Sequence, residues 1–419
     1  MEGDVRVTSV MKRLLGVERV LVEGIDFEGD DLVVRVRLYK RQQLRCSHCS
    51  KRCGKYDNGR GRRRWRALDL GTVKTYFEAD APRVRCREHG VVAARVAWAR
   101  AGSTGYTRTF EEQVAWLTAA TNKTVVVELM RITWRSVGRV LTRVVEEQRQ
   151  GIDLLDNLTR IGIDETSYRR GHRYLTVVVC HQTGRLVWAK AGRNKKVIQA
   201  FLDELGPGRC RRLTHVTCDG AEWIHDTMRK KCKNAAVCLD AFHIVKWASD
   251  AVEKIRREMW NDARKSGDKQ LAGEVKGTRW ALLKNPENLT GKQATVLADL
   301  QRDNARLYRA YLLKEQLRLL LKLPLEQAMP LLESWLAWAS RSRLEPFVKL
   351  ARTIRRQKEA VVEMLHSGLT NGRVESVNAK IRVIQQRAFG FHDPDALISL
   401  AMLTLSGLCP PLPGRLTHS

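Results

Sequence analysis

Residues 160–168 read RIGIDETSY, an apolar run that ends in two neighbouring acids, Asp164 and Glu165. Two more segments rich in β-branched residues follow, YLTVVVCHQ at 174–182 and RLVWAKAG at 185–192. Short runs of this kind, separated by turn residues, are typical of β-strands. The stretch therefore predicts three consecutive strands, the first of which carries the acidic pair.

The chain then alternates helices and strands. The expected elements are a helix at 195–205, a strand that ends at Asp219, a helix at 222–232, a strand that ends at Asp240 and a helix at 242–260. The order βββαβαβ is that of the ribonuclease H-like fold, in which the fourth strand pairs beside the first. This order predicts that Asp164 and Asp219 lie side by side.

Two carboxylates at neighbouring strand ends repel each other unless a cation lies between them. Oxygen ligands favour Mg²⁺, with Mn²⁺ as a substitute. Two such ions could stabilise both the attacking and the leaving oxygen of a phosphoryl transfer. Asp164 and Asp219 are therefore predicted as metal ligands, and a third acidic ligand is required.

The candidate third acid is Glu375, in TNGRVESVNAKIRVIQQRAFGF at 370–391. A helix that opens at Asn371-Gly372 places Asn378 on the same face as Glu375. Taken alone, Glu375 would be read as a solvated helix residue. The basic side chains of this helix are predicted to contact the DNA backbone, namely Lys380, Arg382 and Arg387.

Three further residues are expected to hold or orient the metal ligands, namely Asp240, His243 and Asn378. Asp240 ends a strand next to the predicted site, so it could instead compete with Asp219 for the metal.

The net charge of the chain indicates what kind of partner it binds. The 419 residues contain 75 Lys and Arg against 46 Asp and Glu, a net charge of +29. Such an excess predicts a polyanion partner, most simply nucleic acid, because basic side chains neutralise phosphates and release counterions. A merely basic surface or a ribosomal-type RNA binder are the alternatives. The chain shows no run of about 18 apolar residues and no secretory segment, so we expect a cytoplasmic, nucleoid-associated protein with no membrane partner.

The N-terminal third contains a hairpin pattern at 18–38 and two short metal-binding motifs, Cys46-x-x-Cys49 and Cys86-x-x-His89. Three thiolates and one imidazole suit a structural, tetrahedral Zn²⁺ site. Cys53 or His48 could replace one ligand, and reduced surface thiols are the alternative to a metal site.

Between the two motifs lies a basic loop with one tryptophan. Its side chains are predicted to contact phosphates and to stack on bases: Arg60, Arg62, Arg63, Arg64, Trp65 and Arg66.

Residues 110–147 look helical, with a short helix at 124–130, a turn near Ile132-Thr133 and a second helix at 134–147. That arrangement is typical of a helix-turn-helix, although any hairpin of two helices looks similar. The first turns of the second helix carry the predicted DNA contacts, which are Trp134, Arg135, Ser136 and Arg139.

From about residue 40 to 405 the chain resembles bacterial insertion-sequence transposases of the DDE type, in the zinc-ribbon group called the ISL-three family. The marks are CSHC (46–49), CREHG (86–90), RWRALDLG (64–71), GIDETSYRRGHRY (162–174), VTCDGAEW (216–223), LDAFHIVK (239–246), AYLLKEQLR (310–318) and NGRVESVNAKIRVIQQRAFGF (371–391). The resemblance implies cleavage of element ends and joining of the 3′-OH ends to target DNA. It maps the catalytic acids onto Asp164, Asp219 and Glu375.

The predicted fold is a multidomain α+β chain. Its parts are a β-rich zinc-binding, DNA-contact domain (1–100), a helix-turn-helix domain (101–152), the first part of a ribonuclease H-like core (153–250), an α-helical insertion (251–368), final core helices (369–405) and a tail (406–419). Trp335 and Trp338 of the insertion are predicted to be core residues, the alternative being a tryptophan that stacks on a flipped base.

A homodimer or larger assembly on double-stranded DNA is expected, because two ends must be cut together. The alternative functions are a ribonuclease H-like nuclease or resolvase that does not join, and a transposase-derived DNA-binding regulator.

Overall fold

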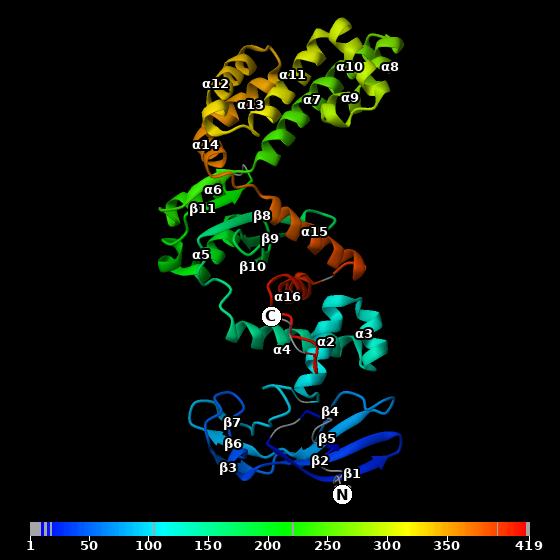
Figure 1. The fold of residues 1–419 in the computed structure, drawn as a ribbon, viewed down its shortest axis with the longest axis vertical. Coiled ribbons are helices and arrows are strands. Elements are labelled where there is room, and N and C mark those ends of the chain that lie inside the picture. The colour runs from blue at the N-terminus through cyan, green and yellow to red at the C-terminus, as the bar shows by residue number, and fades with distance from the viewer. Residues whose placement is uncertain are drawn as a thin grey trace, which may run out of the picture. The chain divides into compact units, whose positions relative to one another are not determined.

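The computed structural model describes residues 10–11, 15–16, 19–103, 105–219, 222–391 and 393–415, although of Glu222 only the backbone (Figure 1). The chain forms two compact units, one built from residues 1–154 and 384–419 and the other from residues 155–383. No helix in the described ranges is both long and apolar enough to cross a membrane.

The first unit begins with two small sheets. A four-stranded sheet has the order β1-β2-β5-β4 and a three-stranded sheet the order β3-β6-β7. Their bounds are β1 Val20–Glu28, β2 Asp31–Leu38, β3 Gly54–Asp57, β4 Arg62–Arg66, β5 Thr75–Asp80, β6 Arg83–Cys86 and β7 Gly90–Ala93, with a short 3₁₀ turn, η1, at Lys40–Gln42. The predicted hairpin at 18–38 is confirmed, since β1 and β2 pair antiparallel.

Three helices follow, α2 (Arg108–Ala120), α3 (Lys123–Met130) and α4 (Trp134–Gly151). Thr107, Asn122 and Thr133 cap their N-termini, because each side chain accepts a backbone N–H of the first turn. Helix α16 (Pro394–Leu405) packs against α2 and α4. This helix was predicted with the core, but its nearly continuous apolar sequence is buried in the first unit.

The second unit is built on a five-stranded sheet with the order β10-β9-β8-β11-β12. Its elements are β8 Arg160–Arg169, β9 Arg173–Cys180, β10 Leu186–Ala191, α5 Lys195–Cys210, β11 His215–Cys218, α6 Glu222–Lys231 and β12 Ala236–Leu239. The predicted strand order is confirmed, because the fourth strand, β11, pairs in parallel with the first, β8. Helix α5 is interrupted at Gly206, where a helix end was predicted.

A helical insertion separates β12 from the last helix of the unit (Figure 1). Its elements are α7 Ala241–Lys265, α8 Lys269–Gly277, α9 Arg279–Leu283, η2 Pro286–Asn288, α10 Gly291–Asp303, α11 Ala305–Leu320, α12 Leu325–Arg341, α13 Glu345–Arg356 and α14 Lys358–Ser367. Trp335 is fully buried and donates its indole N–H to the Leu313 carbonyl at 2.8 Å. Trp338 packs against the same core, so the core prediction for both tryptophans is confirmed.

Candidate active site and metal centre

Asp164 lies within β8, just beyond the residues of that strand that pair with β11, and Asp219 directly follows β11. Thr217 of β11 pairs in parallel with Gly162 of β8, and each acid follows two residues later. Burial raises the pKa of Asp164, and the nearby charges of Asp219 and Asp240 raise it further. The two predicted acids therefore share one electrostatic environment at the same edge of the sheet.

The helix that carries the third acid, α15 (Gly372–Arg387), packs closely on β8. A Cβ atom placed on Gly162 would lie 2.3 Å from Cγ2 of Val374, so only glycine admits the helix at this distance. Asn378 Nδ2 donates to Asp164 Oδ2 at 2.8 Å. Glu375 lies about one turn before Asn378 and is half-buried, so the hydrogen bond of Asn378 places that face of the helix next to Asp164.

A buried polar chain holds the start of α15 on the sheet. His181 Nε2 donates to Thr217 Oγ1 at 2.8 Å, and the Thr217 hydroxyl donates in turn to Asn371 Oδ1. The Asn371 carbonyl then accepts the backbone N–H of Glu375 at 2.8 Å. Burial lowers the pKa of His181 to about 4, which keeps its ring neutral. Only the turn at Asn371 was expected from the sequence, and nothing in it pointed to His181 or Thr217.

Asp240 is buried and both of its carboxylate oxygens accept hydrogen bonds. Oδ1 accepts the backbone N–H groups of Phe242 and Asn371, each at 3.4 Å, and Oδ2 accepts Nδ1–H of His243 at 2.8 Å. That hydrogen bond raises the pKa of His243. Asp240 thus ties the start of α7 to the start of α15.

Glu165, the second acid of the opening motif, was given no role by the sequence analysis. Its side chain is 5% exposed, and the guanidinium of Arg193 lies 3.7 Å from Oε1. Among the described residues, Oε1 has no hydrogen-bond partner. Burial, followed by repulsion from Asp219, raises the pKa of Glu165 to about 7. A buried, under-compensated carboxylate beside Asp164 fits a site that accepts cations, and its position directly after Asp164 was the available signal.

The zinc motifs form the second centre, in the first unit. Within the described ranges, Cys46, Cys49, Cys86 and His89 are the only group of three or more His, Cys, Asp or Glu whose ligand atoms lie within 4.8 Å of one another. The carboxylates of Asp164, Asp219 and Glu375 are therefore spaced more widely.

The spacings in this group suit a tetrahedral ion. Cys49 Sγ and Cys86 Sγ lie 3.7 Å apart, and His89 Nδ1 lies 3.6 Å from Cys86 Sγ and 3.8 Å from Cys46 Sγ. The edges of a tetrahedron around Zn²⁺ are about 3.8 Å between sulfurs and about 3.6 Å between sulfur and nitrogen, given the usual bond lengths. The four predicted ligands are thus brought together. Cys53 Sγ donates to the Lys51 carbonyl and His48 stacks on His89, and neither belongs to this group of four.

The chain matches two family models. One, described as "Transposase", covers residues 161–401, and the other, described as a zinc-finger of transposase IS204/IS1001/IS1096/IS1165, covers residues 42–89. The chain is 45% identical to the transposase for insertion sequence element IS1557 of Mycobacterium tuberculosis over 99% of both chains. The chain belongs to the ISL-three family of insertion-sequence transposases. It is also 26% identical to the transposase for insertion sequence element IS1001 of Bordetella parapertussis, over 91% of this chain and 92% of that one.

The basic segment at 60–66 of this transposase is not a loop, as predicted, but mostly an edge strand, β4. Trp65 is 2% exposed and packs edge-on against Trp98, so it cannot stack on a base in this conformation. Arg66 is also buried, at 5% exposure, and pairs with Asp69 at 2.5 Å. The prediction of DNA contacts at Trp65 and Arg66 is corrected accordingly.

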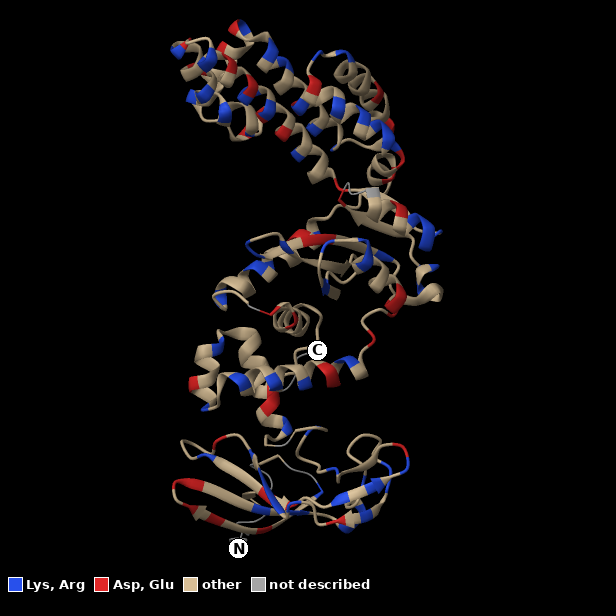
Figure 2. Cartoon of the chain, turned by 180° about the vertical axis from the view of Figure 1, so that it is seen from behind, with Lys and Arg blue, Asp and Glu red and all other residues tan. Residues whose placement is uncertain are grey.

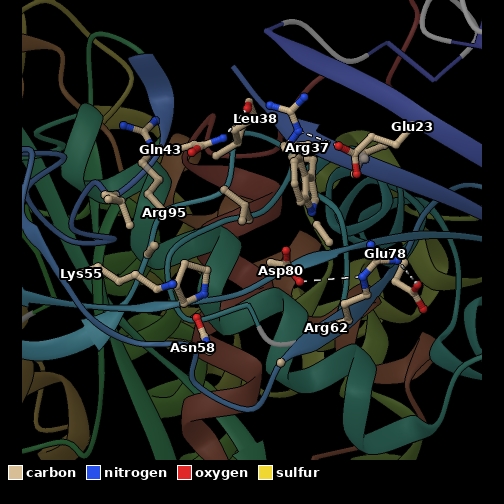
Figure 3. Close-up of a pocket in the computed structure, with 18 residues that line it drawn as sticks. Glu23, Arg37, Leu38, Gln43, Lys55, Asn58, Arg62, Glu78, Asp80 and Arg95 are labelled. Atoms are coloured by element: carbon tan, nitrogen blue, oxygen red, sulfur yellow. Dashed lines mark hydrogen bonds and ion pairs between the residues drawn. The ribbon is translucent and has the colours of Figure 1, made fainter. Parts of the chain in front are cut away.

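Arg62 and Arg64 lie on the exposed side of β4 beside acids, whereas Arg63 is half-buried, with its guanidinium 5.6 Å from the centroid of the Trp65 ring. Arg64 bridges Glu78 at 2.8 Å and Glu28 at 2.6 Å. Arg62 pairs with Glu78 at 3.3 Å, at the rim of a cavity of ≈510 Å³ that also carries Lys55 and Arg95 (Figure 3). Because acids and bases alternate around this cavity, its net positive charge is modest.

The start of α4 presents the predicted DNA contacts. Trp134 is 52% exposed, with the Lys123 ammonium 4.6 Å from its ring centroid. Arg135 and Arg139 are exposed, whereas Ser136 hydrogen-bonds to the capping residue Thr133. Lys and Arg are spread over the strands and helices of both units rather than confined to one element (Figure 2).

On α15, Lys380 and Arg382 are exposed. Arg387 instead donates to the carbonyls of Thr118 and Ala119 at 3.2 and 2.9 Å. Its guanidinium therefore caps the C-terminal end of α2, and a DNA contact of Arg387 stays a prediction.

Proposed function

We propose that this transposase binds the terminal inverted repeats of its element, cleaves the ends by metal-dependent hydrolysis and joins the 3′-OH ends to target DNA. The observation that supports the proposal is the contact of α15 with the strand that carries Asp164. Asp164 and Asp219 each lie two residues beyond the paired residues Gly162 and Thr217, and α15, which carries Glu375, packs on β8 through Gly162 and Val374 and donates from Asn378 to Asp164.

The residues present fit divalent cations. Asp164, Asp219 and Glu375 would hold two Mg²⁺, or Mn²⁺ in their place, and Glu165 adds a buried carboxylate whose Oε1 has no hydrogen-bond partner among the described residues and lies 3.7 Å from the Arg193 guanidinium. Bound metal would supply charge stabilisation at the attacking and leaving oxygens of the phosphoryl group. The chain's own groups hold these acids in position: Asn378 orients Asp164, and Asp240 fixes the helix starts.

DNA contacts are proposed for basic side chains that are exposed or half-buried and for one exposed tryptophan. These residues are Arg60, Arg62, Arg63, Arg64, Trp134, Arg135, Arg139, Lys380 and Arg382. The core is proposed to be ribonuclease H-like, because its strand order is that of the fold, and α3–α4 to act as a helix-turn-helix. The protein is further proposed to act as a homodimer or larger assembly on DNA, and to be located in the cytoplasm at the nucleoid.

The test is a joining assay with Mg²⁺, a labelled element-end duplex bearing a free 3′-OH, and a plasmid target. Wild type should form joined product, while Asp164→Ala and Glu375→Gln should lose joining and keep DNA binding. Glu359→Gln is the matched control, since Glu359 is an exposed acid on α14 whose side chain is 89% exposed.

Cleavage without joining, in Mg²⁺ and in Mn²⁺, would favour a nuclease or resolvase. Binding without either reaction would favour a DNA-binding regulator.

A further inference from the structure

The helical insertion contains a basic groove between α7, α8 and α9, with a volume of ≈720 Å³. This size lies within the range of about 300–1,000 Å³ that is usual for ligand sites. All the charged side chains that line it are basic, and two tryptophans join them: Arg256, Arg257, Lys276, Arg279, Trp260 and Trp280. We call this surface the insertion groove.

One acid behind the groove organises its arginines. Glu253 accepts two hydrogen bonds from Arg256, each at 2.8 Å, and one from Arg257 at 2.9 Å, and Arg279 lies 3.8 Å away. The hydrogen bonds of Arg256 hold the pKa of Glu253 at about 2. Because three guanidinium groups share one carboxylate, the cluster keeps a net positive charge even before Lys276 is added. Fixed cations of this kind suit phosphates.

The groove also presents an open aromatic face. Trp280 is 56% exposed, and the guanidinium of Arg279 lies 5.1 Å from its ring centroid. Trp260 has Arg264 at 4.9 Å in the same way. An exposed indole flanked by arginine suits stacking with an unpaired base, because every base has a flat π-face.

Gly273 leaves the backbone of α8 open at the groove. It lies in the middle of α8 (Lys269–Gly277), where alanine would favour the helix. A Cβ atom at Gly273 would meet nothing within 4 Å, so packing within the chain does not require glycine there. A strand that approaches the helix backbone closely would require it.

We propose that the insertion groove binds a DNA strand, with phosphates on Arg257, Lys276 and Arg279 and an unpaired base stacked on Trp280. An acidic peptide would satisfy the cations, but it would leave the indole face without a flat partner. The proposal rests on the chain's action on DNA, yet it adds a strand-binding site that is separate in sequence from the three acids and from the helix-turn-helix. Unpaired nucleotides at or near a processed end are the substrate class that it fits.

The experiment measures binding of the full chain to two labelled probes of equal length, one a paired duplex and the other a duplex with a single-stranded 3′ tail. Wild type should bind the tailed probe more tightly. Trp280→Ala should weaken binding to the tailed probe by about 5- to 150-fold, the range that base–aromatic stacking gives, with duplex binding changed less than about twofold. Trp280→Phe should recover part of the loss.

Lys276→Gln should lower the salt dependence of tailed-probe binding by about 0.7 in the slope of log K against log salt, the value for one phosphate contact on a single strand. Arg302→Ala is the matched control, since this exposed arginine on α10 pairs with Asp299 at 2.8 Å outside the groove. Gly273→Ala should raise the melting temperature and weaken tailed-probe binding.

The proposal would be overturned if wild type bound the two probes with equal affinity. It would also be overturned if Trp280→Ala bound the tailed probe as tightly as wild type, or if it lost the same affinity for both probes. Melting temperatures of all variants exclude misfolding as the cause of a loss. This binding assay needs no cleavage or joining. A failed joining assay would therefore count against the proposed function, and the binding result could still be interpreted.

Discussion

Replacing Gly162 by alanine tests how the third acid is positioned. The added Cβ would lie 2.3 Å from Val374 Cγ2, 2.9 Å from Thr217 Oγ1 and 3.0 Å from His181 Nε2. Carbon atoms in contact sit about 3.5–4.0 Å apart, so α15 or the strand must move by roughly 1 Å or more. Overpacking of this kind costs about 1–3 kcal/mol of the free energy of unfolding.

The effect on joining should exceed the effect on folding. Asn378 and Glu375 both lie on the helix that must shift, and a misplacement of about 1 Å can lower a rate by about 100-fold. We expect Gly162→Ala to join element ends about 100-fold more slowly while its DNA affinity stays unchanged. The measurement is a single-turnover joining rate with pre-cut ends, beside urea unfolding. Gly291→Ala is the matched control, because a Cβ there meets nothing within 4 Å.

A second substitution separates the steric cause from any other. Val374→Ala removes the methyl group that the new Cβ would strike, so it should restore part of the rate in the Gly162→Ala background. The recovery should be partial, because the new Cβ atom would still lie close to Thr217 Oγ1 and His181 Nε2. Coupling between contacting residues is commonly about 0.5–3 kcal/mol. A Gly162→Ala protein that joins at the wild-type rate, or purely additive effects of the two changes, would refute the reasoning.

Three other predictions concern His181, the zinc site and Arg387. Burial depresses the pKa of His181 to about 4, so the unfolded chain binds the proton first and stability is lost as pH falls from about 6.5 towards 4. Urea unfolding at pH 7 and pH 5 should show a loss of about 2 kcal/mol that His181→Asn lacks, and parallel pH profiles would contradict this. Cys86→Ser should release zinc, measured by mass spectrometry of the metal, and lower the melting temperature of the first unit, whereas Cys53→Ser should do neither. Arg387→Ala should lower the free energy of unfolding by about 1.5–3 kcal/mol, because two hydrogen bonds from its charged guanidinium are lost. Arg382→Ala should weaken DNA binding without changing the free energy of unfolding. The reverse pattern would contradict a structural role for Arg387 and a DNA-binding role for Arg382.

The sequence predicted the second unit well because its signals are local. Strand and helix periods, read between 159 and 260, yielded the element order, and the rule that parallel strands share an edge brought Asp164 next to Asp219. The zinc quartet was equally accessible, since ligand spacing and residue type are both visible in the chain. In both cases the pattern that carries the prediction, a strand or helix period or a pair of metal ligands, lies within a few neighbouring residues.

The contacts that the sequence did not reveal involve partners that are distant in sequence. The stretch RRRWR looked like a loop because its arginines are so frequent, yet alternation places Trp65 in the core while Glu78 and Glu28 on neighbouring strands balance Arg64. Arg387 was predicted as a phosphate ligand, and the carbonyls that it caps lie 268 and 269 residues earlier. A guanidinium serves a helix end as well as it serves a phosphate, and only tertiary structure distinguishes the two.

The insertion explains how a third acid can arrive so late in the chain without disturbing the site. It leaves the sheet after β12 and returns through α14, which packs against β12, with Ser367 Oγ lying 3.6 Å from Cys238 Sγ. Its ends are therefore fixed beside each other, and loop closure becomes only slightly costlier as an insertion lengthens. Asp240 contacts both the start of α7 and Asn371, the residue before α15. The register of α15 is thus set by Asp240, Thr217 and Gly162 of the sheet, and the helices between are free to acquire a surface such as the insertion groove.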